Sequence, residues 1–61
     1  MRAGQIAVCK CGDVFRVTDI SPSIVWGVYV GREYTGHPVS YVKLAPWGVA
    51  AEFSRKERKK R

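Results

Sequence analysis

Two cysteines and one histidine are the residues of this 61-residue chain whose types and spacing suggest metal or redox chemistry. Cys9 and Cys11 form a CxCG motif with Gly12, and thiolates are good zinc ligands. A structural zinc site normally takes four protein ligands, and His37 is the only other strong candidate in the sequence. We therefore expect no intrachain metal site and no cofactor. A site completed by water, by Asp13 or by a second subunit stays open.

The cysteine spacing also bears on oxidation and compartment. In an extended chain, side chains two residues apart point to one face, and a disulfide between them would be strained. We expect two small buried or half-buried thiols, in keeping with a reduced, cytoplasmic protein, with a virion or nuclear setting left open. The apolar run 6–9 is too short for a signal peptide, and no run approaches the roughly 18 apolar residues of a membrane span.

Catalytic chemistry finds little support in the sequence. A nucleophile needs a base within hydrogen-bond reach, and the only histidine, His37, lies between Gly36 and Pro38 in a predicted solvated loop. The acidic residues are scattered, and no glycine-rich phosphate-binding motif occurs. We expect no catalytic residues and no enzyme activity.

The charge distribution divides the chain into a nearly neutral body and a cationic tail. Residues 1–53 carry five cations and four acids, a net charge of +1, whereas residues 54–61 carry six cations and Glu57, a net charge of +5. Blocks of like charge usually stay solvated and often bind polyanions. The cations of the tail are Arg55, Lys56, Arg58, Lys59, Lys60 and Arg61.

Hydrophobic periodicity predicts an all-β body with short strands and turn residues between them. The chain is long enough for one small domain, which we place at residues 1–53, followed by the basic tail 54–61. A turn or a short closing strand is expected at 49–53, and the tail is expected to be disordered when free. The predicted strands span residues 5–11, 14–20, 24–30 and 38–44.

The two strongest predicted strands, 24–30 and 38–44, are expected to form a hairpin. The even positions of the first are large and apolar, so Trp26 is expected in the core. Pairing Val28 with Val42 would then place Tyr29 beside Tyr41 on the outer face, with Lys43 next to them. Such a face suits base stacking and phosphate contact, and it also suits a purely structural tyrosine pair.

The order of elements resembles a small SH3-like barrel of the KOW or Tudor kind, with four or five short antiparallel strands. The segment GDVFRV at 12–17 is similar to the start of the second strand of such barrels, and VKLAP at 42–46 is similar to the strand before the closing turn. The resemblance spans roughly residues 4–53. It implies a module that binds RNA, DNA or protein peptides and is seldom an enzyme.

These observations together favour a nucleic-acid-binding accessory module for DNA or RNA, of the kind found in bacteria, phages and ribosomes. The tail would contact phosphates, and Tyr29, Tyr41, Lys43 and Arg16 would form a second surface. The alternative is a protein-interaction module that docks on a polymerase, a ribosome or a virion. Polybasic association with an anionic membrane and a merely solubilising tail also stay open.

Overall fold

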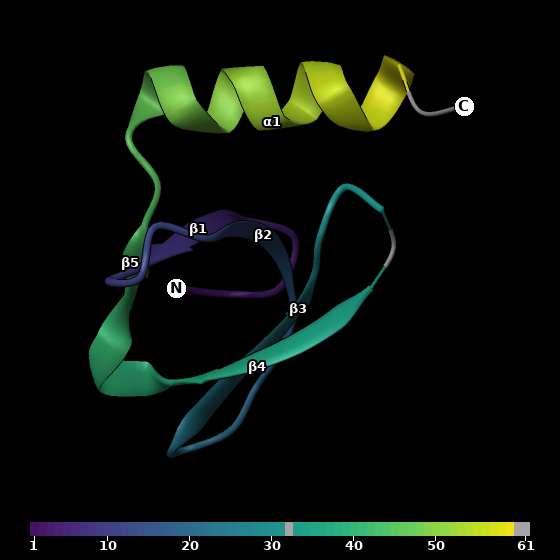
Figure 1. Cartoon of the computed structure of the whole chain (residues 1–61). Helices are drawn as coiled ribbons and strands as arrows, with labels where there is room; N and C mark the ends of the chain where they lie inside the picture. Colours follow the sequence, from purple (N-terminus) through teal and green to yellow (C-terminus); the bar gives the residue numbers. More distant parts are fainter. Residues whose placement is uncertain (32, 60–61) are drawn as a thin grey trace.

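The computed structural model describes residues 1–31 and 33–59 and consists of one antiparallel sheet with a helix on one face (Figure 1). The strand order is β4-β3-β2-β1-β5. The elements are β1 (Ile6–Cys9), β2 (Val14–Ile20), β3 (Ile24–Val28), β4 (Tyr34–Pro38), the 3₁₀ turn η1 (Val39–Tyr41), β5 (Val42–Leu44) and α1 (Trp47–Lys59). The prediction of short antiparallel strands in a mostly β protein is confirmed.

The predicted hairpin between 24–30 and 38–44 is wrong. β3 pairs with β4, with Val28 opposite Tyr34 and Trp26 opposite Gly36. The chain then passes through η1 and places β5 on the far edge of the sheet, where it pairs with β1. Sequence reasoning treated residues 38–44 as one strand, whereas η1 follows Pro38 directly and divides that run between two edges of the sheet.

The core lies on the opposite face of β3 from the one predicted. Val25 is 1% exposed, whereas Trp26 is 43% exposed, so the prediction of a core tryptophan is wrong. Gly27 makes this choice of face favourable, because a Cβ there would lie 2.6 Å from the carbonyl oxygen of Arg16 and would overlap the Phe15 ring. A ring as large as Phe15 fits under β3 only where β3 has no side chain. The central cluster consists of Ala7, Phe15, Val17 and Val25.

Helix α1 replaces the turn or short strand predicted at 49–53. The amide of Ala50 donates to the carbonyl of Pro46 at 2.9 Å, which opens the helix immediately after that proline. Good helix formers predominate from Ala50 to Glu57, and Phe53 is buried against the sheet. Since α1 continues to Lys59, residues 54–59 are helical in the free chain, contrary to the predicted disorder. The division at residue 53 therefore falls inside the helix.

Candidate nucleic-acid interface

Among the described cations of the tail, Arg55 and Arg58 lie away from the sheet, and Lys56 lies at the rim of a small recess between α1 and Val14. Phe53 is buried and Glu57 is half-buried on the inner side, whereas Arg55, Lys56 and Arg58 are exposed. This is the arrangement of an amphipathic helix with one face toward the sheet. The side chain of Lys59 and the residues Lys60 and Arg61, which were also predicted to bind nucleic acid, lie outside the described residues.

Arg16 fixes the end of this helix to the sheet. Its guanidinium donates to both carboxylate oxygens of Glu57, with Nη2 to Oε1 at 2.6 Å and Nε to Oε2 at 3.0 Å. A further bond runs from Nη1 to the carbonyl of Gly4 at 2.6 Å. The hydrogen bond to Glu57 raises the pKa of Arg16 above its ordinary value. The structure therefore places Arg16 as a helix anchor, apart from the exposed cations of α1.

Tyr29 does not lie beside Tyr41, so the predicted tyrosine pair is wrong. Tyr29 packs against the central cluster, and its hydroxyl donates to the Asp13 carboxylate at 2.9 Å. The same hydroxyl lies 3.1 Å from the hydroxyl of Thr35. Tyr29 is thus partly buried and engaged within the fold, and the predicted outer face of two tyrosines and a lysine does not form.

Tyr41 instead lies among lysines at the β5 edge. Tyr41 is 55% exposed, and the Lys10 ammonium lies 5.4 Å from the centroid of its ring, within range of a cation–π interaction. A hollow of about 180 Å³ adjoins the ring, lined by Lys10, Ser40, Tyr41, Val42 and Lys43. The sequence did not indicate Lys10, because only the pairing of β1 with β5 brings this residue opposite Tyr41. There the Lys10 amide donates to the Tyr41 carbonyl at 2.8 Å.

The register places Lys43 on the face of the sheet that carries α1. Val14 lines a small recess together with Phe53 of α1, so Val14 points toward the helix. Val8 lies directly opposite Val14, and Lys43 lies directly opposite Val8. Directly opposed residues share a face of a sheet. Lys43 and the exposed cations of α1 therefore lie on the same side of the molecule.

The two cysteines are joined in a disulfide, so the prediction of free thiols is wrong. Cys11 lies in a turn beyond the end of β1, which Gly12 completes with a φ of 96°, and the chain is not extended there. The Cα atoms of Cys9 and Cys11 are consequently 5.3 Å apart, an ordinary separation for a disulfide. The cysteines thus give no reason to favour a reducing compartment.

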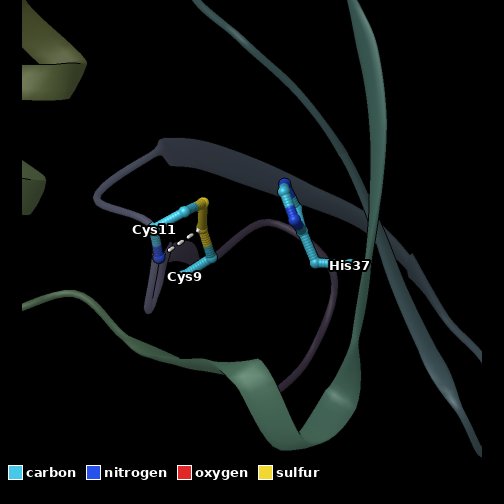
Figure 2. A group of neighbouring side chains, drawn as sticks. All are labelled: Cys9, Cys11 and His37. Carbon is cyan, nitrogen blue, oxygen red and sulfur yellow. Dashed lines mark hydrogen bonds between the residues drawn. A yellow bond between two sulfur atoms is a disulfide. The ribbon is translucent and has the colours of Figure 1, made fainter.

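His37 lies across from this disulfide, as Figure 2 shows. It is part of β4 and half-buried, so its predicted place in a solvated loop is wrong. Its ring stacks on Phe15 with centroids 5.1 Å apart, and Nε2 lies 2.9 Å from the Thr35 hydroxyl. A ring nitrogen of His37 and the two cysteine sulfurs all lie within 4.8 Å of one another.

Comparison with known proteins returned no matching family model, no matching curated protein and no matching solved structure. Within residues 1–31 and 33–59, no helix combines the length and the apolar character needed to cross a bilayer. Function is accordingly inferred from the geometry of the chain itself.

Proposed function

We propose that this chain is a small nucleic-acid-binding module that presents an ordered basic helix beside an aromatic pocket. The observation that carries this proposal is the anchoring of α1. Phe53 and the Arg16–Glu57 pair hold the helix on the sheet and leave Arg55, Lys56 and Arg58 exposed, with Lys56 at the rim of the recess beside Val14. Cations on an ordered helix contact phosphates with less loss of conformational entropy than the same cations on a disordered tail.

We propose an SH3-like barrel as the architecture of this module. The strand order β4-β3-β2-β1-β5, with a 3₁₀ turn between β4 and β5, supports this proposal. The approach of His37 in β4 to Cys9 in β1 supports it too, because two strands separate β4 from β1 in the sheet. The sheet must curl strongly to bring these residues together.

The hollow beside Tyr41 would supply a second contact. An exposed tyrosine ring stacks a base irrespective of sequence, and Lys10 and Lys43 at its margins would hold the adjoining phosphates. Because stacking requires an unpaired base, we propose single-stranded DNA or RNA as the ligand at this pocket. The proposed activity is binding without catalysis, and a cytoplasmic location stays a prediction.

The pocket can be tested by fluorescence anisotropy with a labelled single-stranded oligonucleotide. Tyr41→Ala should weaken binding by about 1–3 kcal/mol, the usual contribution of one stacked base. Tyr29→Phe is the matched control, since Tyr29 lies within the fold and its change should leave affinity as it is. Equal affinity of Tyr41→Ala and the wild type would exclude stacking at this pocket.

A protein-interaction module is the second candidate, and exposed aromatic residues favour it. Trp47 is 87% exposed and Tyr34 is 79% exposed, and aromatic residues often contribute most of the energy of protein interfaces. Affinity purification after nuclease treatment separates the two functions. Docking predicts a stoichiometric protein partner that persists after nuclease and is lost with Trp47→Ser, whereas the nucleic-acid module predicts that nuclease removes whatever copurifies.

A further inference from the structure

Cys9, Cys11 and His37 form a cluster of metal-ligating residues, none of which lines the hollow beside Tyr41. Cys9 belongs to β1, Cys11 to the turn after it, and His37 to β4 (Figure 2). Their donor atoms all lie within 4.8 Å of one another, although β2 and β3 separate the two strands in the sheet. The cluster therefore lies where the curled sheet brings β4 close to β1.

The separations suit a tetrahedral metal. With zinc–sulfur bonds of about 2.3 Å and zinc–nitrogen bonds of about 2.0 Å, ligand atoms of one zinc ion lie roughly 3.5–3.8 Å apart. The His37 nitrogen, within 4.8 Å of the sulfurs, needs to approach them to roughly 3.5 Å, and the two sulfurs need to separate from their bonded distance.

The surroundings of His37 resemble those of a metal-bound imidazole. The Phe15 ring holds the plane of the imidazole by stacking. Thr35 lies 2.9 Å from Nε2, the Tyr29 hydroxyl lies beside Thr35, and the Asp13 carboxylate accepts a hydrogen bond from Tyr29. Metal-binding histidines typically make such a hydrogen bond through the ring nitrogen that does not bind the metal, so with Nε2 beside Thr35 the ligand atom of His37 would be Nδ1.

We propose that reduction of the Cys9–Cys11 disulfide creates an intrachain site for Zn²⁺, with Cys9, Cys11 and His37 as ligands and a water molecule in the fourth position. The oxidised chain holds the two sulfurs in a covalent bond and is the metal-free state. Reduction and zinc binding would thus replace the disulfide between β1 and the turn after it by a metal ion that connects β1 to β4.

The reductant in this scheme is a cellular dithiol. Cys11 is exposed, and one thiolate of the reductant attacks its sulfur. The Cys9–Cys11 bond then breaks, and Cys9 leaves as a thiolate that takes up a proton. The second thiol of the reductant then displaces Cys11, and the reductant departs as its own disulfide. Zinc binds both cysteines as thiolates together with a neutral His37 nitrogen, and two protons pass to solvent.

Native mass spectrometry of the full chain with added zinc tests this proposal. A phosphine-reduced sample should bind one zinc ion per chain, and the oxidised sample should bind none. Zinc should also raise the melting temperature of the reduced chain alone, because it binds the folded state in preference to the unfolded one. Zinc bound equally by oxidised and reduced chains, or one ion per two chains, would overturn the site.

Single substitutions identify the ligands. His37→Asn and Cys11→Ser should each weaken zinc binding by at least about 100-fold, since loss of an outer-shell partner alone costs 10–100-fold. Lys10→Ala, which changes the residue between the cysteines and keeps all three ligands, should bind zinc with the affinity of the wild type. Full affinity in either ligand variant contradicts the proposal. Should His37→Asn fail to fold, the imidazole NMR signals of the reduced wild type decide, and no change in them on zinc addition would exclude His37.

Discussion

At the scale of single residues, two glycines allow the large aromatic rings to take their places. Gly27 lies against Phe15, and Gly36 lies against Trp26, whose ring carbon would be 2.7 Å from a Cβ added at that position. Phe15 is thereby buried in the core, while Trp26 covers the outer side of β4. The absence of a side chain at each site is a packing requirement, since neither glycine has a positive φ.

Gly27→Ala should destabilise the protein by about 1–3 kcal/mol or more, the usual cost of overpacking a core. The new Cβ would meet the Phe15 ring and the Arg16 carbonyl, and the backbone oxygen cannot move without disturbing the β2–β3 pairing. Chemical denaturation measures the change. Gly48→Ala is the control, because nothing lies within 4 Å of its Cβ position and the site is in the first turn of α1, where stability should stay the same or increase.

The choice of core face on β3 could not be read from the sequence. The even positions of the predicted strand 24–30 are all large and apolar, whereas the odd positions include Gly27 and Tyr29, and this pattern favoured the wrong face. What decides the face is the fit of Gly27 over Phe15, a contact between strands. The β2–β3 register also shifts between Val17 and Asp19, an irregularity that strict alternation does not predict.

Per atom removed, Trp26→Ala should therefore cost less stability than Val25→Ala. Val25 is fully buried in the central cluster, and its truncation leaves a cavity, whereas Trp26 is partly solvated and its removal leaves none. Urea unfolding of the two variants provides the comparison. A much larger loss for Trp26→Ala, at about 3–5 kcal/mol, would place this residue in a core and contradict the structure.

At the scale of elements, α1 depends on a small set of contacts with the sheet. Phe53 provides the apolar contact and the Arg16–Glu57 pair the polar one. Sequence reasoning recognised the cations of the tail and missed the helix, because Gly48 close to Pro46 suggested a turn. The helix formers after Gly48 and the burial of Phe53 outweigh that signal, and a single sequence does not reveal which residues a helix will meet.

Phe53→Ala should release α1 from the sheet. Phe53 is 5% exposed, and truncation of a buried phenylalanine costs about 3–5 kcal/mol, which exceeds what the Arg16–Glu57 pair can restore. Hydrogen exchange should then show faster exchange throughout α1, with β2 and β3 less affected. Arg55→Ala is the control on the same helix, since Arg55 is exposed, and equal effects of the two variants would argue against Phe53 as the anchor.

The ion pair at the end of α1 should make a small contribution to stability that does not vary with pH near neutrality. A hydrogen bond to Glu57 raises the pKa of Arg16, so its contribution is fully present below the ordinary arginine pKa and is lost only as pH rises through the still higher folded value. Arg16→Met should therefore cost about 0.2–1 kcal/mol at pH 7 and the same at about pH 9. A stability cost that changes between these two pH values would show that the contribution of Arg16 does not come from its ion pair with Glu57.

At the scale of the whole molecule, strands far apart in the sheet order meet because the sheet curls. That curl brings β4 to β1 around the cluster of Cys9, Cys11 and His37, and the pairing of β5 with β1 brings Lys10 to Tyr41. The sequence predicted short strands and a basic end. It could not show which strand becomes the neighbour of β1, since that depends on contacts between residues more than thirty positions apart.

The salt dependence of nucleic-acid binding tests the central proposal most directly. Binding of a single-stranded oligonucleotide by the wild type should weaken with salt, and neutralising Arg55, Lys56 and Arg58 to Gln should flatten the slope of log K against log salt by about 0.7 for each phosphate that is no longer neutralised. Exchanging Lys for Arg and Arg for Lys at these positions keeps the charge and should keep the slope. A folded neutralised variant with the affinity and slope of the wild type would contradict the proposal that α1 is the nucleic-acid-binding surface.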